Sequence, residues 1–167
     1  MAILNNCILN NQEIDLKIRR IAYQIYESNV NFEDVVLAGI YENGYILAKK
    51  IKHELEKITD LKTILCSVKI NKKNPEKLIT TSLDPFQYKN KSLVLIDDVL
   101  NSGTTLIYGV KHFLETPLIQ FKTAVLVNRN HKKYPVKADF KGISLSTSLN
   151  EHVNVILKDD KSRVDLT

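Results

Sequence analysis

The stretch that decides the fold is Leu93-Val94-Leu95-Ile96-Asp97-Asp98-Val99-Leu100-Asn101-Ser102-Gly103-Thr104-Thr105. Its aliphatic start predicts a strand buried on both faces, as in the centre of a parallel sheet. Two adjacent carboxylates follow, and a polar turn then leads into an expected helix over residues 106–115. Because a helix N-terminus presents unpaired N–H groups, such a turn favours a phosphate, and Gly103 lets the backbone approach it closely. Asp97 and Asp98 are placed to accept hydrogen bonds from a ribose diol and to hold hydrated Mg²⁺. We therefore predict a sugar-phosphate site.

An ordinary strand and turn is the alternative interpretation of this stretch. Two adjacent carboxylates repel each other, which favours a functional reason for Asp97 and Asp98 over a solvated strand end. Ser102, Thr104 and Thr105 could simply cap the next helix, and capping uses the same groups as phosphate binding, so both interpretations stay open. The chain contains neither the G-x-x-x-x-G-K-[ST] run of a P-loop nor the G-x-G-x-x-G run of a dinucleotide fold.

Composition predicts one globular domain. The chain has 167 residues, of which 44% are hydrophobic and 26% are charged. No window approaches the roughly 18 apolar residues of a membrane span. The start of the chain, from Met1 to Cys7, lacks the basic and apolar parts of a secretory signal, so we expect a cytoplasmic protein. Cys7 and Cys66 are far apart and predict reduced thiols. The net charge of +5 is compatible with anionic substrates or with nucleic acid.

Strand-like and helix-like segments alternate along the chain. A helical pattern over residues 14–26 precedes a buried strand over 35–40, a second helix over 44–55 and a strand over 61–70. Residues 71–91 are polar, and most of them are expected to form a mobile loop. After the stretch quoted above come a strand over 122–127, a basic turn over 128–135, and extended segments over 138–145 and 152–157. This order predicts an α/β fold with a mostly parallel sheet.

The stretch around Asp97 and Asp98 resembles the phosphoribosyl pyrophosphate (PRPP) signature of the type I phosphoribosyltransferases. That signature has four apolar, two acidic and two apolar residues, followed by Thr/Ser-Gly-x-Thr. The chain is similar to the branch of pyrimidine operon attenuator and uracil phosphoribosyltransferase proteins in Leu37–Ile40 before Gly44, and in Ala124–Val127 followed by Arg129 and His131. The run 135–140 and Gly142 extend this similarity.

The resemblance implies a three-layer α/β sandwich with a central, mostly parallel sheet. It implies a single domain over residues 1–167, with a small hood formed by roughly 128–150 and the N-terminal segment. It also implies a homodimer or higher homo-oligomer. The expected reaction transfers the phosphoribosyl group of PRPP to a pyrimidine base, with uracil as the candidate, and releases pyrophosphate. Mg²⁺ is the expected cofactor, and no membrane partner is expected.

The resemblance also assigns roles to residues. The expected catalytic residues are Asp97, Asp98, Lys72 and Lys73, and the two aspartates would hold Mg²⁺ through water. The expected phosphate-contacting residues are Gly39, Tyr41, Asn43, Gly44, Asn101, Ser102, Gly103, Thr104 and Thr105. Phe140 would stack on the base while Lys141 reads its edge, although Phe140 could instead belong to the core, and the two glycines before residue 45 could serve packing alone.

Three departures from the family predict weak catalysis. The family carries basic or hydroxyl residues between Gly39 and Gly44, where this chain has Tyr41, Glu42 and Asn43. The family's mobile loop carries an Arg, where this chain offers only Lys69, Lys72 and Lys73. Purine-type relatives use an Asp as general base at the position of Asn101, and an amide cannot accept that proton.

The alternative function is a nucleotide-sensing, RNA-binding regulator of pyrimidine genes with little or no catalysis, which the same branch contains. Its RNA surface would be basic and its binding salt-dependent. The candidate RNA-binding residues are Arg19, Arg20, Arg129, His131, Lys132 and Lys137.

Overall fold

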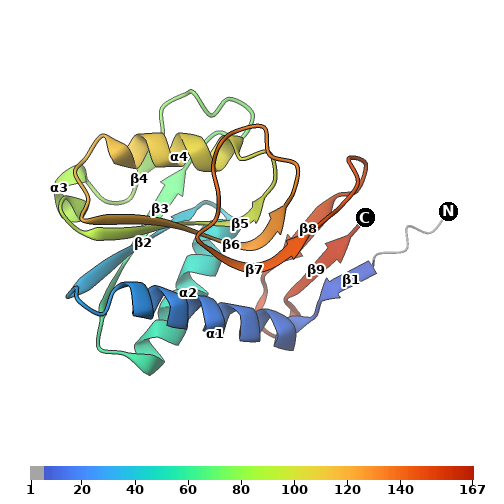
Figure 1. Cartoon of the computed structure of the whole chain (residues 1–167), viewed down its shortest axis with the longest axis horizontal. Helices are drawn as coiled ribbons and strands as arrows, with labels where there is room; N and C mark the ends of the chain where they lie inside the picture. Colours follow the sequence, from blue (N-terminus) through green and yellow to red (C-terminus); the bar gives the residue numbers. More distant parts are fainter. Residues whose placement is uncertain (1–5) are drawn as a thin grey trace.

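A computed structural model describes residues 6–167 of the protein (Figure 1). The main sheet has six strands in the order β4-β3-β2-β5-β6-β7, and all are parallel except the short β4, which runs antiparallel to β3. Its strands are β2 (Asp34–Ile40), β3 (Lys62–Lys69), β4 (Thr80–Thr81), β5 (Ser92–Leu100), β6 (Gln120–Arg129) and β7 (Phe140–Leu145). The predicted α/β class and parallel sheet are confirmed.

Helices cover both faces of this sheet and give the three expected layers (Figure 1). Helices α1 (Asn11–Ser28) and α2 (Asn43–Ile58) pack on one face, and α4 (Thr104–Leu114) packs on the other. The start of α1 is fixed by a capping box, in which Asn10 accepts from the amide of Glu13 and the Glu13 carboxylate accepts from the amide of Asn10. The predicted apolar face of α1 is buried as expected; its residues are Ile14, Ile18, Ile21, Ala22 and Ile25.

The segment 71–91 differs from the expected loop. It contains β4, whose residues Thr80 and Thr81 pair with the end of β3, and the short helix α3 (Pro85–Tyr88). Helix α3 begins with a capping box from Asp84, and Tyr88 lies 1% exposed in the core with its ring 5.2 Å from that of Phe113. The polar composition of this segment therefore gave no sign of the buried Tyr88 ring, which packs against Phe113 of α4.

A second sheet of three strands lies beside the carboxyl ends of the main strands (Figure 1). It is formed by β1 (Asn6–Leu9), β9 (Arg163–Leu166) and β8 (Val153–Ile156), with a 3₁₀ turn (Asp159–Lys161) between β8 and β9. Strand β1 of this sheet comes from the N-terminal segment, whereas residues 128–150 contribute no strand to it, because β7 pairs with β6 in the main sheet. The part of the predicted N-terminal segment that covers residues 1–5 lies outside the described residues.

None of the helices within residues 6–167 combines the length and the apolar character needed to cross a membrane.

Candidate functional site

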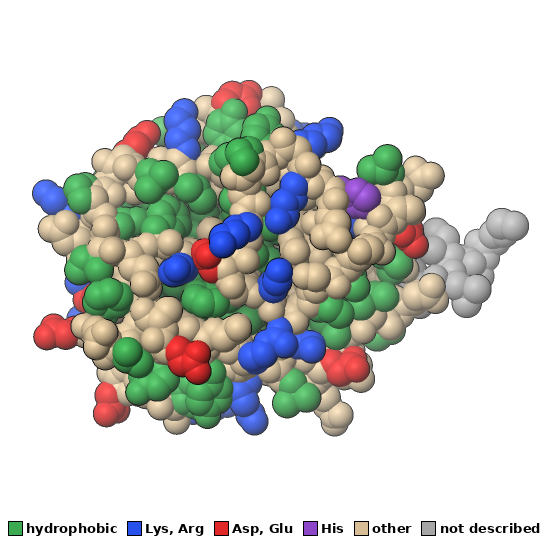
Figure 2. Space-filling view, in the orientation of Figure 1, with side chains coloured by type: hydrophobic (Ala, Val, Ile, Leu, Met, Phe, Trp, Pro, Cys, Tyr) green, Lys and Arg blue, Asp and Glu red, His purple; other side chains and the backbone are tan. Residues whose placement is uncertain are grey.

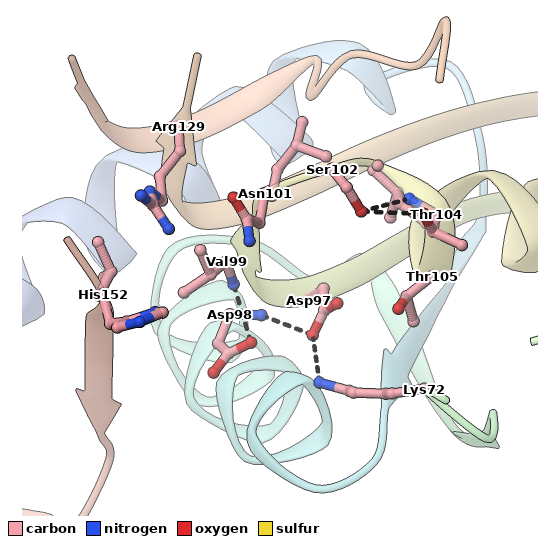
Figure 3. A pocket seen from close by; sticks show the side chains of 14 residues that line it. Lys72, Asp97, Asp98, Val99, Asn101, Ser102, Thr104, Thr105, Arg129 and His152 are labelled. Carbon is pink, nitrogen blue, oxygen red and sulfur yellow. Dashed lines mark hydrogen bonds and ion pairs between the residues drawn. The ribbon is translucent and has the colours of Figure 1, made fainter. Parts of the chain in front are cut away.

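A cavity of about 310 Å³ lies at the carboxyl ends of β5 and β6 (Figure 3). The continuous run 97–106 forms most of its wall. Lys72 closes one side from the segment after β3, while Arg129, His152 and Val153 close the other. In open α/β sheets, ligands bind in crevices at the carboxyl ends of the strands. The cavity therefore lies where the fold places a ligand.

The turn between β5 and α4 has the conformation of an anion-binding loop. Gly103 adopts a φ of 84°, in the left-handed region, and α4 begins at the next residue. The hydroxyls of Ser102 and Thr104 lie 2.9 Å apart, and the Thr104 amide donates to the Ser102 hydroxyl at 3.3 Å. Since the first amides of a helix have no acceptor within the helix, those of Thr105 and Leu106 face the open end where the cavity lies. This turn can hold a phosphate with neutral donors alone.

The basic turn before β7 supports the phosphate loop from behind. The carbonyl of Ser102 accepts hydrogen bonds from the amides of Lys133 and Tyr134, at 2.7 and 3.2 Å. A Cβ on Gly103 would lie 2.6 Å from Cγ1 of Val136. The turn that the sequence suggested as an RNA-binding surface therefore also fixes the conformation of the phosphate loop.

Asp97 and Asp98 form a buried acidic pair next to this loop. Asp97 is 4% exposed, and its Oδ1 accepts from the amide of Asp98 at 2.9 Å. Asp98 accepts from the Val99 amide at 2.8 Å and from Asn43 Nδ2 at 2.9 Å. Burial, followed by the neighbouring Asp98 carboxylate, raises the pKa of Asp97 to about 8, while Lys72, 3.9 Å from Oδ1, opposes the rise. Two adjacent carboxyl groups thus share one nearby lysine, so a further cation would favour the ionised form of Asp97.

These donors fit a magnesium ion that is bound largely through water and substrate. Carboxylate oxygens are ligands that Mg²⁺ prefers, and it usually keeps several waters beside one or two carboxylates. Within residues 6–167, no group of three or more His, Cys, Asp or Glu side chains converges on one point. Asp97 and Asp98 could therefore hold the waters of a hydrated Mg²⁺, and a phosphorylated substrate would have to supply direct ligands.

A second helix N-terminus, that of α2, lies beside the acidic pair. A Cβ on Gly44 would lie 2.6 Å from the carbonyl oxygen of Ile96, and one on Gly39 would lie 2.5 Å from Cα of Tyr45. Both glycines are therefore needed for α2 to start against the ends of β2 and β5. Asn43 joins this helix to the acidic pair through Asp98 and to β8 through the carbonyl of Val155, at 3.0 Å.

Comparison with known proteins supports the geometry. A family model described as "Phosphoribosyl transferase domain" matches residues 5–160. The chain belongs to the phosphoribosyltransferase family. It is 35% identical over 162 residues to the "Bifunctional protein PyrR" of Clostridium kluyveri, covering 91% of this chain and 90% of that relative. The protein of the same name from Macrococcus caseolyticus is 32% identical, covering 94% and 95%. The crystal structure of the hypoxanthine phosphoribosyltransferase of Trypanosoma cruzi shares the fold, with a TM-score of 0.80 at 14% identity over 96% and 95% of the two chains.

The structure of this phosphoribosyltransferase brings together the site residues that were predicted at the end of β5 and in the turn that follows it. Asp97, Asp98 and the whole 101–105 turn line the cavity, together with Lys72. Lys73 is exposed and does not line it. Of the other predicted phosphate-contacting residues, Gly39 lies near the end of β2, Tyr41 lies in the following loop, and Asn43 and Gly44 begin α2. None of these four residues lines the cavity.

The predicted base-binding residues Phe140 and Lys141 do not line this cavity. Phe140 is the first residue of β7, level with Ala124, and its side chain packs on the core beneath α1 and α2. Lys141 is exposed beside it, and Arg20 donates to the carbonyls of Lys141 and Gly142, at 2.7 and 2.6 Å. The alternative that Phe140 belongs to the core is the one the structure supports.

Several candidate RNA-binding residues are already engaged within the protein. Arg129 is only 5% exposed, and its guanidinium donates to Thr147 Oγ1 and to the carbonyls of Ser148 and Glu151. Arg19 lies 3.5 Å from the Glu54 carboxylate, and His131 contacts the carbonyl of Thr147. Lys132 and Lys137 are exposed.

Sequence reasoning missed the far wall of the cavity. Arg129 and Asn101 point into the cavity, and His152 faces Asp98 across it (Figure 3). His152 directly precedes β8. Its only sequence signal was its position directly before the apolar run 153–157, which becomes a strand of the small sheet.

Proposed function

We propose that this phosphoribosyltransferase transfers the 5-phosphoribosyl group of PRPP to a ring nitrogen of a pyrimidine base, with uracil as the first candidate. The bond between ribose C1 and the pyrophosphate oxygen breaks, and a bond from C1 to the base nitrogen forms. Pyrophosphate leaves, and the proton of the base nitrogen passes to water or to the pyrophosphate. One observation carries this proposal: the acidic pair Asp97 and Asp98 and the phosphate loop that leads into α4 lie in the same wall of the cavity.

Each part of the cavity wall has a role in this reaction. The amides at the start of α4 and the hydroxyls of Ser102, Thr104 and Thr105 hold the 5′-phosphate. The Asp97 and Asp98 carboxylates accept hydrogen bonds from the ribose diol. They would also hold Mg²⁺ through water, and the ion would neutralise charge on the pyrophosphate. Holding the sugar at both ends orients C1 toward the base and keeps water from that position.

The far wall is the proposed base site, in place of Phe140 and Lys141. His152 and Val153 offer a ring and an aliphatic face for stacking, and buried Arg129 offers donors to the carbonyl oxygens of a pyrimidine. Asn101 cannot take a proton from the base at neutral pH. Uracil loses its N–H proton more readily than ordinary amides do, so a pyrimidine depends less on an enzyme base than a purine does.

The test is pyrophosphate release by the purified protein with uracil, cytosine, hypoxanthine or guanine at saturating PRPP and Mg²⁺. We expect turnover with uracil and none with either purine, and the turnover should be slow because the segment after β3 offers Lys72 but no arginine to support the leaving group. The loss of one charge-assisted contact in the transition state typically lowers a rate on the order of 10²-fold. Clear activity with a purine would overturn the pyrimidine assignment.

The matched control is the double variant Asp97→Asn/Asp98→Asn, which keeps size and removes both charges. We expect it to lose PRPP binding by at least about 100-fold, because charged hydrogen bonds and the metal contact disappear together. Binding of PRPP to this variant as tight as to the wild type would show that the acidic pair is not the site.

A nucleotide-sensing RNA-binding regulator is the second candidate. One observation favours it: Arg20 of α1 lies against exposed Lys141 of β7, and Lys and Arg side chains gather on this face (Figure 2). A basic face of this kind suits RNA phosphates. Failure to turn over any base, with retained binding of uridine monophosphate, would favour this function. A cytoplasmic location accords with either candidate, since Cys7 and Cys66 are both free thiols.

A further inference from the structure

The end of β3 places a lysine beside the loop before α2. Val68 and Ile70 are buried in the core on the α4 face of the sheet. Because side chains alternate along a strand, Lys69 emerges on the opposite face, where α2 packs. Its Nζ lies 5.7 Å from the centre of the Tyr41 ring. The amide of Tyr41 donates to the carbonyl of Val68 at 2.8 Å, so the strand end and the loop are held together.

The loop before α2, which consists of Tyr41 and Glu42 and is called the α2 loop below, contains no cation for a phosphate. Tyr41 and Glu42 are exposed, and Glu42 is the residue before the helix without capping it through its side chain. The amide group of Asn43 is already committed to Asp98 and to the carbonyl of Val155. The groups left to meet an anion are the free amides at the start of α2 and the Glu42 carboxylate, which repels an anion.

We propose that Lys69 is the pyrophosphate-binding cation of this enzyme, supplied from β3 in place of a basic residue in the α2 loop. The inference rests on the proposed use of PRPP. The Tyr41 ring holds the ammonium at the loop through its face, and this contact is compatible with simultaneous ion pairing to phosphate oxygens. A pyrophosphate at the start of α2 then meets helix amides on one side and Lys69 on the other.

The other lysines near the site are not equivalent to Lys69. Lys72 lies 3.9 Å from Asp97 Oδ1 and serves the acidic pair. Lys49 lies over the Tyr45 ring, at 5.2 Å from its centre, further along α2. Lys69 is therefore the lysine seated against the first residue of the loop.

The experiment separates pyrophosphate binding from nucleotide binding. Calorimetry with Mg²⁺ measures the Kd values of pyrophosphate, PRPP and uridine monophosphate for the wild type and for Lys69→Met. We expect the variant to bind pyrophosphate and PRPP about tenfold more weakly, the loss typical of one charged contact. Uridine monophosphate has no pyrophosphate and should bind within about twofold of the wild type.

Three further variants complete the design. Lys62→Met makes the same charge change on the same strand, about 23 Å away at its other end, and should leave all three Kd values unchanged. Lys69→Arg keeps the charge and should retain pyrophosphate binding. Lys69→Gln replaces Lys69→Met if the latter does not fold.

Unchanged pyrophosphate binding by Lys69→Met overturns the role of Lys69 while leaving the proposed reaction intact. Equal weakening of pyrophosphate and uridine monophosphate also overturns it, because Lys69 would then act only on the structure of the loop. If the wild-type protein binds neither PRPP nor uridine monophosphate, the proposed function fails first.

Discussion

The two helix N-termini at the carboxyl edge of the sheet differ in how they meet an anion. The loop before α4 combines a left-handed glycine, hydroxyl groups and free amides, and the turn before β7 supports it from behind. The loop before α2 combines two glycines with an exposed carboxylate and an asparagine that is turned toward the protein. We propose that the first loop can hold a phosphate by itself. The second depends on a neighbouring strand for its charge, so the two loops should respond differently to mutation and to pH.

Among the changes that compare the two loops, the largest expected effect comes from Gly103→Ala in the first loop. The left-handed φ of 84° costs an L-residue roughly 1–2 kcal/mol, and the new Cβ would lie 2.6 Å from Val136. We expect binding of uridine monophosphate and of PRPP to weaken on the order of 30-fold, since the loop amides move away from the phosphate. Calorimetry on folded variant protein, verified by circular dichroism, measures this. Unchanged binding of both ligands would mean that the loop does not hold the 5′-phosphate.

A smaller effect is expected from pH, and it should be confined to ligands that bring Mg²⁺ to the acidic pair. The pKa of Asp97 is raised to about 8, so this carboxyl is mostly protonated at pH 7 in the free protein. A cation beside it favours the ionised form, so binding of PRPP with Mg²⁺ releases a proton and tightens as pH rises. We expect about a tenfold gain between pH 7 and pH 9, and a plateau above that range.

The control for pH is uridine monophosphate without Mg²⁺, whose phosphate is about nine-tenths ionised at pH 7. It brings no cation to Asp97, so its affinity should change by no more than about twofold over the same range. Asp97→Asn should remove the slope for PRPP. The same group affects stability with the opposite trend. Between about pH 4 and pH 8 the folded protein binds more protons than the unfolded chain, so the free energy of unfolding falls as pH rises and levels off above pH 8. A PRPP affinity that does not vary with pH would contradict this account of Asp97.

The smallest expected effect is from Glu42→Gln in the second loop. Removing an exposed carboxylate near the pyrophosphate relieves a repulsion of roughly 0.5–1 kcal/mol, so pyrophosphate should bind about threefold more tightly. Titrations at low and high salt check the origin of the gain, which should shrink as salt screens the charges. Weaker binding of pyrophosphate would show instead that Glu42 supports the loop.

The main sheet was predictable because its signals are local. The aliphatic runs that became β2 and β5 and the periodic face of α1 each reflect burial at one position of the fold. The small sheet was not predictable in the same way. Its central strand β9 has four residues, and its partner β1 lies at the other end of the chain, so no short window contains the pairing.

The residues of the candidate site were predictable where they form one continuous run and were not predictable where the fold brings distant segments together. The run 97–105 is continuous, and its spacing alone placed the acidic pair next to the phosphate loop. Arg129 looked like a surface residue because the groups that bury its guanidinium lie at 147–151, in a segment without a periodic pattern. Phe140 looked functional because it stands between Asp139 and a nearby glycine. In the structure it is the first residue of β7 and pairs with the apolar Ala124 of β6.

The contact between Arg20 and β7 affects whether the edge of the main sheet can pair with a strand of another molecule. Strand β7 is the outer strand of an open six-stranded sheet, and an outer strand with free carbonyls is a template for pairing with another chain. Arg20 occupies the carbonyls of Lys141 and Gly142, and the Lys141 side chain adds a charge at the same place. The opposite edge ends in β4, only two residues long. One edge is thus obstructed by a cation from α1 and the other is too short to template a partner, which protects the sheet from growing into aggregates.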